Sequence, residues 1–243
     1  EIYTLPLHDA LPISINDTSS DGNQPMRSGN ILMMCNGEIY NHLELKEKYN
    51  LQCSSRSDCE VVLRLYEKFG FAETVKKLYG VFAIVLVDGD RTYIARDRIG
   101  VRPLYIGWTS AKRLAVASVP NCLVGFCQIV SPLLPGHTAM YTEEPGLVYL
   151  YKDQISLATT RLTDGTEALR TALTEAVRLR LMSDRPMGCL LSGGLDSSLV
   201  AALLVKFLGG KNVRTYSIGM EGSTDLYYAR KVARYLQTDH HEV

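Results

Sequence analysis

Residues 188–198 read Gly-Cys-Leu-Leu-Ser-Gly-Gly-Leu-Asp-Ser-Ser, and this stretch decides the fold of the second half of the chain. An apolar run, Met187–Leu191, leads into the glycines and predicts a buried strand, while the Ala-, Val- and Leu-rich run Ser197–Leu208 predicts a helix after them. A turn between a strand and a helix is where an open α/β sheet binds its ligands. We therefore expect an anion-binding loop at residues 192–198.

The residue types in this loop suit phosphate. Gly193 and Gly194 let backbone N–H groups approach phosphate oxygens without a Cβ in the way, and the following helix presents its free N–H groups and its dipole. Hydroxyl donors are added by Ser192, Ser197 and Ser198. Asp196 repels phosphate, so we expect it to bind Mg2+ that bridges to the phosphates. No lysine follows the glycines, which argues against the Gly-x-x-x-x-Gly-Lys-Ser/Thr loop. The alternative of an ordinary tight turn would explain the two glycines but not all seven residues of the loop.

Strands and helices alternate on both sides of the loop. A helix opening at Asp164 would carry Leu169, Leu173, Val177 and Leu181 on one face. Downstream, the sequence predicts a strand at Thr215–Ile218, a helix at Leu226–Leu236 and the start of a strand at His241. Short links between such elements indicate a parallel, doubly wound sheet. Because few strands are present, we expect the chain to be truncated at its C-terminus.

The N-terminal half is rich in strands. Val81–Val87 is a continuous apolar run and predicts a strand buried on both faces, and Asp88-Gly89-Asp90 predicts a turn into a second strand at Thr92–Ala95. Ser57 and Glu60 have the spacing of a capping box, and the apolar periodicity behind them predicts a helix that ends at Gly70. Further strands are expected at Ile31–Cys35, Leu114–Ala117 and Leu147–Tyr151.

The first thirteen residues, EIYTLPLHDALPI, contain two prolines and show neither helix nor strand periodicity. They resemble the conceptual translation of a sequencing-library adaptor, and we leave them out of the fold prediction. The alternative is a genuine N-terminal arm, which genomic codons upstream of Ser14 would reveal. The expected organisation is non-native sequence at 1–13, one domain at 14–157 and a second domain at 158–243.

The bulk composition argues against several classes of function. Lys plus Arg and Asp plus Glu number 26 each, so no global field is available to hold nucleic acid or an anionic membrane. The longest apolar runs are far too short to span a bilayer. The six cysteines form no Cys-x-x-Cys pair and no Cys/His zinc spacing, so we expect reduced thiols in a cytoplasmic protein.

Two motifs carry a family resemblance. Ser192–Ser198 (SGGLDSS) is similar to the signature loop of ATP pyrophosphatases, and Asn36–Asn41 (NGEIYN) resembles a segment of class II glutamine amidotransferases. In this order the two resemble the family of glutamine-hydrolysing asparagine synthetases, from about Ser14 to the last residue. Further segments similar to that family are Ser57–Glu60, Arg96–Leu104, Pro135–His137 and Thr215–Met220. The resemblance implies an α+β glutaminase domain of stacked antiparallel sheets with flanking helices, followed by the start of an α/β parallel-sheet ATP pyrophosphatase domain.

The resemblance also implies an activity. A carbon–nitrogen ligase of this family makes asparagine from glutamine, aspartate and ATP through a β-aspartyl-AMP intermediate, with Mg2+ as a further cofactor. An N-terminal cysteine attacks the glutamine amide and releases ammonia. We expect no nucleic-acid or membrane partner, and a homodimer for the full-length enzyme. Because the first residue here is Glu1 and the arginine that clamps glutamine is missing, we expect the chain as written to be inactive.

Residue roles follow from the same resemblance. Asn36 and Gly37 match an oxyanion hole, to which a side-chain amide and a glycine N–H can donate. The glutamine-binding positions are Ser14, Ile15, Asn16, Asn36, Gly37, Glu38 and Asp58. The ATP and pyrophosphate positions are Leu191, Ser192, Gly193, Gly194, Asp196, Ser197, Ser198 and Ile218, of which Asp196 is the metal position.

Structural alternatives stay open for several of these residues. Asn36-Gly37 alone would be an ordinary turn, and Asp58 could simply favour a helix dipole. Arg96–Pro103 is interpreted as a structured turn with an internal ion pair. Two other functions also remain open: a β-lactam-forming synthetase, which the glutaminase motifs disfavour, and a non-catalytic scaffold protein. The first residue of the full-length reading frame, cysteine or not, would separate the enzyme from the scaffold.

Overall fold

A computed structural model describes residues 16, 17, 19–153 and 165–243. The chain divides into two compact units, residues 1–158 and 159–243, and each is described by itself. Ser14 and Ile15, which are predicted to bind glutamine, and Asp164, the predicted start of a helix, lie outside the described residues.

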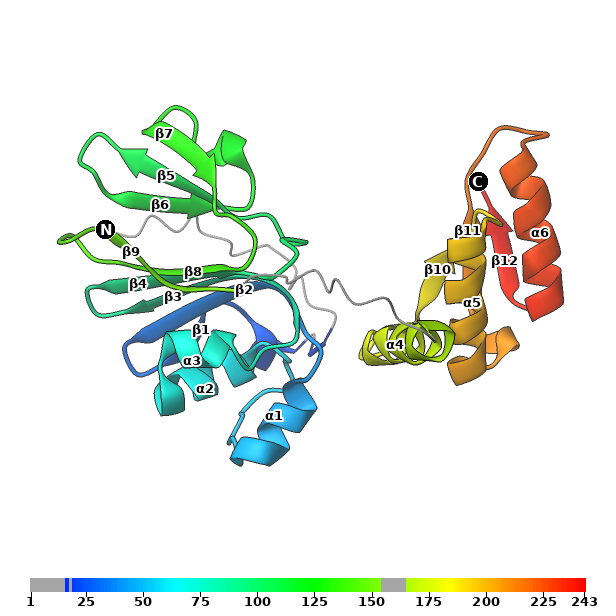
Figure 1. Ribbon diagram of the computed structural model, residues 1–243, viewed down its shortest axis with the longest axis horizontal. Coiled ribbons are helices and arrows are strands. Elements are labelled where there is room, and N and C mark those ends of the chain that lie inside the picture. The colour runs from blue at the N-terminus through cyan, green and yellow to red at the C-terminus, as the bar shows by residue number, and fades with distance from the viewer. Residues whose placement is uncertain (1–15, 18, 154–164) are drawn as a thin grey trace. The chain divides into compact units, whose positions relative to one another are not determined.

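The first unit is built on a six-stranded antiparallel sheet with the strand order β1-β2-β3-β4-β8-β9 (Figure 1). The strands are β1 (Met26–Ser28), β2 (Ile31–Ile39), β3 (Gly80–Asp88), β4 (Arg91–Arg96), β8 (His137–Tyr141) and β9 (Leu147–Lys152). The predicted turn between β3 and β4 is confirmed, because Asp88 pairs with Arg91 and leaves two residues between them. Gly89 adopts the left-handed conformation that such a two-residue turn requires.

Strand β3 lies inside the sheet and both of its faces are covered, as its apolar run predicts. Phe82, Ile84 and Leu86 belong to a core shared with helices α2 (Glu60–Phe69) and α3 (Phe71–Val75). Ala83 and Val85 belong to a second core on the opposite face. The apolar run is therefore continuous because both faces of this strand pack against a core.

A second, three-stranded antiparallel sheet covers that opposite face, in the order β6-β5-β7 (Figure 1). It consists of β5 (Tyr105–Thr109), β6 (Leu114–Ala117) and β7 (Cys127–Pro132). Ile106 of β5 packs with Ile94 and Ala139 of the large sheet. Helix α1 (His42–Tyr49) follows β2 directly. The expected stack of antiparallel sheets with flanking helices is confirmed.

The start of helix α2 differs from the prediction, and the capping box is wrong. Cys59 is the N-cap residue, and the Ser57 hydroxyl accepts from the Cys59 N–H at 3.3 Å instead of from a helical N–H. The Glu60 carboxylate accepts from the N–H groups of Ser54 and Ser55 at 2.9 and 2.7 Å, in the loop before the helix. Glu60 therefore orders the preceding loop and does not cap its own helix.

The second unit is a parallel sheet with helices, as predicted. Its strands β10 (Gly188–Leu190), β11 (Arg214–Ser217) and β12 (Asp239–Glu242) are parallel and adjacent in that order. Its helices are α4 (Gly165–Leu179), α5 (Leu195–Leu208) and α6 (Thr224–Leu236). Helix α5 connects β10 to β11 and α6 connects β11 to β12, which is the β-α-β arrangement of a parallel sheet. Val177 of α4 is buried, but Leu169 is 68% exposed, so the predicted apolar face of this helix is covered only in part.

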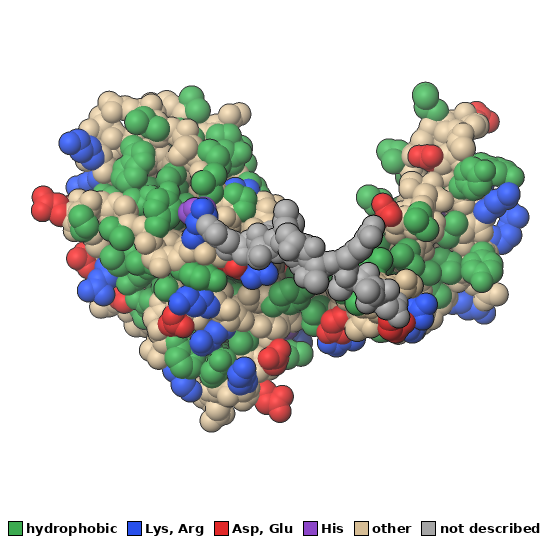
Figure 2. Space-filling model, viewed as in Figure 1, with side chains coloured by type: hydrophobic (Ala, Val, Ile, Leu, Met, Phe, Trp, Pro, Cys, Tyr) green, Lys and Arg blue, Asp and Glu red, His purple; other side chains and the backbone are tan. Residues whose placement is uncertain are grey.

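Acidic and basic side chains are interspersed on the face shown in Figure 2, in keeping with the equal numbers of the two charges. Among the described residues, no helix combines the length and the apolar character that crossing a membrane requires. All six cysteines are free, and those at positions 35 and 59 are buried.

Candidate functional site

The outer edge of β2 forms the first candidate site. Strand β1 pairs with β2 only as far as Met33, so the edge beyond it has no strand partner among the described residues. Side chains take over at two positions: Gln24 Oε1 accepts from the Cys35 N–H, and Asp58 Oδ2 accepts from the Ile39 N–H, both at 2.6 Å. Because N–H directions alternate along a strand, the N–H of Gly37 points to the same edge, between these two.

Only glycine fits at position 37. A Cβ there would overlap the backbone of Val81 and Phe82 on the adjacent strand β3. Asn36 and Gly37 pair with Ala83 and Phe82 inside β2, so the alternative that Asn-Gly forms a turn is wrong. The close approach of two backbones explains the glycine, and it leaves the Gly37 N–H at the open edge.

Three of the predicted glutamine-binding residues come together beside this edge. The Asn16 Nδ2 donates to Glu38 Oε2 at 3.4 Å and to Asp58 Oδ1 at 3.3 Å. Asp58 is 3% exposed and stands two residues before α2, so a position near the helix N-terminus and a position in the cluster are compatible. The cluster therefore presents two carboxylates, held by one amide, at the end of β2.

The electrostatics of this cluster favour a bound cation. Burial, and then the charge of Asp58, raise the pKa of Glu38 to about 7, while Arg102 acts in the opposite direction. A cationic group placed against Glu38 would lower that pKa again, because an opposite charge stabilises the carboxylate. The site thus suits an ammonium group.

The Asn36 side chain is exposed, and its Nδ2 donates to the Ser118 hydroxyl at 3.3 Å. Glu38 is two residues away on the same strand, so both side chains project from the same face of the sheet. Ser118 follows β6 and was not predicted as part of the site. Nothing in the local sequence signals this contact, because it joins two different sheets.

The segment after β4 is a loop held by side-chain hydrogen bonds to its backbone, but the predicted internal ion pair is wrong. The Arg96 guanidinium donates to backbone carbonyls, those of Gly100, Arg102 and Leu133, at 2.7–2.8 Å. The Asp97 carboxylate accepts from the backbone N–H groups of residues 99, 100, 101 and 102 and of Phe82. The two side chains therefore bind the backbone around them instead of each other.

The glycine loop of the second unit lies where it was predicted. Helix α5 begins at Leu195, two residues earlier than expected, so Asp196 and Ser197 lie in its first turn. Gly193 has a φ of 79°, and a Cβ on it would meet the backbone of Tyr228 and Ala229 in α6. The hydroxyls of Ser192 and Ser197 lie 3.0 Å apart, and the Ser192 hydroxyl accepts from the Gly194 N–H at 3.4 Å.

Leu191 and Ile218 lie at the ends of the adjacent parallel strands β10 and β11, as predicted. Leu191 is buried, its N–H donates to the Tyr216 carbonyl at 2.8 Å, and its carbonyl accepts from the Ser217 hydroxyl. Ile218 is 80% exposed. Of the two, only Ile218 has an exposed side chain, while Leu191 joins the strand ends through its backbone hydrogen bonds.

Asp196 is exposed in the first turn of α5, so its carboxylate is available to a metal ion. Within the part of the chain that the structure describes, no three His, Cys, Asp or Glu side chains are grouped so as to hold a metal. The residues present fit Mg2+ bound by one carboxylate together with substrate phosphates, which is the way this ion is commonly held.

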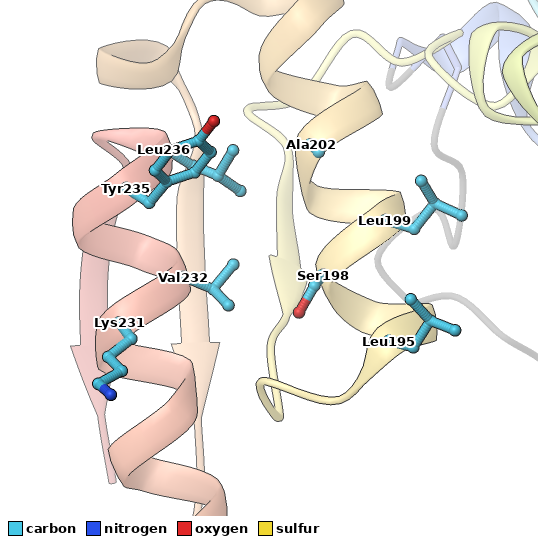
Figure 3. Close-up of a pocket in the computed structure, with 8 residues that line it drawn as sticks. All are labelled: Leu195, Ser198, Leu199, Ala202, Lys231, Val232, Tyr235 and Leu236. Atoms are coloured by element: carbon cyan, nitrogen blue, oxygen red, sulfur yellow. The ribbon is translucent and has the colours of Figure 1, made fainter.

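A groove of about 400 Å³ lies between α5 and α6 (Figure 3). Its lining is mainly apolar, with Lys231 and Tyr235 on the α6 side and Ser198, Leu195 and Leu199 on the α5 side. Ser198 connects it to the glycine loop, and the Ser198 hydroxyl is buried and has no hydrogen-bond partner among the described residues.

Comparisons with known proteins give a family match for each of the two units. Residues 8–163 match the family model of the glutamine amidotransferase domain, and residues 168–243 match that of asparagine synthase. Glutamine-hydrolysing asparagine synthetases of Cricetulus griseus and Bos taurus are each 40% identical to the chain over 256 residues, which is 91% of this chain and 46% of each relative. The chain thus spans about half the length of these relatives.

Among solved structures, an allosteric regulatory enzyme of purine biosynthesis is similar with a TM-score of 0.47 and 18% identity, over 90% of this chain and 62% of that one. The sequence relatives confirm the predicted resemblance to glutamine-hydrolysing asparagine synthetases. The chain belongs to the glutamine amidotransferase domain family, and the asparagine synthase match follows in its second unit.

Proposed function

We propose that this protein takes part in ATP-dependent asparagine synthesis with glutamine as the nitrogen donor. The observation that carries the proposal is the combination of an edge N–H at Gly37 with the carboxylate pair Glu38 and Asp58. The Gly37 N–H suits an oxyanion that develops on a side-chain amide, and the two carboxylates suit an α-ammonium group. Glutamine has both of these groups. The names of the relatives support the overall reaction.

In the first unit, Glu38 and Asp58 would hold the α-ammonium of glutamine, and the Asn16 amide bridges the two carboxylates. Nucleophilic attack on the side-chain amide of glutamine develops negative charge on the amide oxygen. The Gly37 N–H and the Asn36 Nδ2 would donate to that oxygen, and the Asn36 amide would exchange its bond to Ser118 for it. Ser14 and Ile15 remain proposed members of the same site.

In the second unit, the loop would bind the pyrophosphate portion of ATP. Backbone N–H groups at the start of α5 and the hydroxyls of Ser192 and Ser197 would face the phosphates. The Ser198 hydroxyl, also predicted to bind them, is buried beside the adjoining groove. Asp196 would hold Mg2+, which supplies positive charge to neutralise the phosphate oxygens. Ile218 would contact the nucleotide, and aspartate would be the carboxylate that ATP activates.

The proposal extends to the organisation of the protein. It includes a glutaminase domain at residues 14–157 and a synthetase domain at 158–243. It also includes a cytoplasmic location and a homodimer for the full-length enzyme. Size-exclusion chromatography with light scattering on the full-length protein would test the dimer.

Calorimetric titration of the purified chain tests the glutamine site. We expect the chain to bind glutamine but not N-acetylglutamine, which has no α-ammonium. Glu38→Gln should weaken glutamine binding about tenfold or more, in line with the loss of a charge-assisted contact. Glu73→Gln is the matched control, because Glu73 lies on α3 and pairs at the surface with Lys76. Equal affinity for glutamine and N-acetylglutamine would refute the proposed site.

Titration with ATP tests the second unit independently. Binding should need Mg2+ and should weaken when Asp196→Asn removes the proposed ligand of the ion. The Asp225→Asn variant removes a carboxylate from the first turn of α6, outside the glycine loop, and should bind as the parent does. ATP binding that is indifferent to both EDTA and Asp196→Asn would contradict the proposed role of Asp196.

A further inference from the structure

Where β1 ends, a side chain takes the place of a strand along the outer edge of β2. Gln24 Oε1 accepts from the Cys35 N–H at 2.6 Å, and Gln24 Nε2 donates to the Cys35 carbonyl at 2.9 Å. In the register of β1 and β2, Met26 pairs with Met33, so position 24 is the one that faces Cys35. A carboxamide has the donor and the acceptor of a backbone amide, so these two bonds imitate one rung of an antiparallel ladder.

Other side chains engage the remaining polar groups of this edge. Asp58 Oδ2 accepts from the Ile39 N–H at 2.6 Å, and His42 Nδ1 lies 3.0 Å from the Ile39 carbonyl oxygen. The Cys59 Sγ lies 3.7 Å from the Gly37 carbonyl oxygen, within reach of a thiol donor. Among the residues that the structure describes, these contacts leave the Gly37 N–H as the free backbone donor of the edge.

The direction of this N–H depends on how the strand is held on either side of it. Gly37 itself is a weak restraint, because a residue without a Cβ samples a wide range of backbone angles. Gln24 anchors the residue two positions before Gly37, and Asp58 anchors the residue two positions after it. An oxyanion donor must aim closely at the oxygen, because a hydrogen bond weakens steeply as its angle bends.

We propose that Gln24 is a positioning residue that aims the Gly37 N–H at the side-chain amide oxygen of the substrate. The proposal rests on the proposed glutamine site. Gln24 would touch neither the substrate nor the reacting atoms, and it would act through the backbone of Cys35. Without its two bonds, the strand before Gly37 would be held by β3 alone, and the contribution of this N–H would be lost. The carboxylates of Glu38 and Asp58 would keep theirs.

Three variants of the 243-residue chain test this role. Gln24→Met removes the donor and the acceptor but keeps the length of the side chain. Gln24→Asn keeps the amide but is one methylene too short to bind Cys35 in the same way. Gln52→Met is the matched control, because the Gln52 amide is exposed and donates to Asn50 at 3.4 Å, away from β2. Parental fluorescence of Trp108 in the first unit shows that a variant is folded, and either folded Gln24 variant decides the test.

The first readout needs no ligand. Asn36-Gly37 is the one Asn-Gly pair in the sequence, so ¹³C in the carbonyl of asparagine and ¹⁵N in glycine give a single, assigned amide signal in NMR. The residual dipolar coupling of this N–H reports the direction of the bond. We expect the coupling to shift in both Gln24 variants and to keep its parental value in Gln52→Met.

The second readout is the affinity for two amino acids at neutral pH. Norleucine has the α-ammonium group and the chain length of glutamine but no side-chain amide. In the Gln24 variants, glutamine affinity should fall about fivefold, as expected for one neutral hydrogen bond, while norleucine affinity should stay within about twofold of the parental value. Gln52→Met should bind both as the parent does.

An unchanged dipolar coupling in a folded Gln24 variant would overturn the proposal. Equal losses of affinity for glutamine and norleucine would also overturn it, because they would show a general disturbance of the site. If the parent binds neither amino acid while the coupling shifts as expected, the proposed function fails and the effect of Gln24 on the Gly37 N–H stands.

Discussion

Replacing Glu60 by glutamine is expected to destabilise the first unit by about 3 kcal/mol at neutral pH. Glu60 is 3% exposed, and its carboxylate accepts from the N–H and hydroxyl groups of Ser54 and Ser55 and from the Arg64 guanidinium. Burial by itself raises the pKa of this group, but these hydrogen bonds outweigh it and lower the pKa to about 2. A glutamine would turn an NH2 group toward donors that need an acceptor.

The magnitude follows from the pKa. The ordinary value of 4.5 and the folded value of about 2 differ by about 2.5, and each unit corresponds to about 1.36 kcal/mol. Because the folded pKa is depressed, this stabilisation is fully present above pH 4.5 and is lost as the pH falls toward 2. Linkage gives a loss of about 1.4 kcal/mol between pH 7 and pH 3.5.

Urea unfolding at these two pH values provides the assay. The chain has one tryptophan, Trp108 in β5, so its fluorescence reports the first unit alone. The difference in unfolding free energy between the parent and Glu60→Gln should shrink by about 1.4 kcal/mol on going from pH 7 to pH 3.5. Glu47→Gln, on the exposed side of α1, removes the same charge and should change stability by less than about 0.5 kcal/mol. A difference that does not depend on pH would refute the reasoning.

Three further variants follow from the structure. The pKa of Glu38 is raised to about 7, so its contribution to the stability of the first unit is present below pH 4.5 and is lost as the pH rises through 7. In Glu38→Gln, the stability monitored by tryptophan fluorescence should therefore change less with pH over this range. The difference from the parent should be roughly 1–2 kcal/mol after discounting for the partial exposure of Glu38. Gly193→Ala should destabilise the second unit by about 1–3 kcal/mol in thermal melting monitored by helix content, because residue 193 has a φ of 79° and α6 leaves no room for a Cβ. The control variant Gly194→Ala should leave the fold intact, because residue 194 has a φ of −71°. Ser223→Ala removes the hydroxyl that caps α6 by accepting from the Leu226 N–H and should cost about 1 kcal/mol in the same melting experiment.

Local patterns were enough to predict most of the elements. Val81–Val87 is uninterrupted because β3 is covered on both faces, and the glycine loop is recognisable because its constraints lie within a few residues. The start of α2 was placed wrongly for a physical reason. Ser57 and Glu60 have the spacing of a capping box, but the N–H groups of Ser54 and Ser55 compete for the same carboxylate and win.

The contacts that assemble the proposed glutamine site could not be predicted in this way. Glu38 and Asp58 were paired through a family resemblance, and neither spacing nor periodicity brings them together. The bonds from Gln24 to Cys35 and from Asn36 to Ser118 join segments distant in the sequence and leave no local trace. Asn36-Gly37 has the residue types of a tight turn, and only the close approach of β3 shows why a strand needs glycine there.

Because β1 is short, the described residues leave the edge of β2 without a strand partner at the proposed oxyanion hole. Had β1 continued along β2, the N–H of Gly37 would form an ordinary ladder bond, and the backbone donor proposed for the oxyanion would be lost. An unpaired edge must still satisfy its other polar groups. The Gln24 amide binds both the N–H and the carbonyl of Cys35, and Asp58 binds the N–H of Ile39. Because these side chains satisfy the positions on either side, the described part of the chain leaves the Gly37 N–H open between them, and Asp58 would serve both the fold and the proposed site.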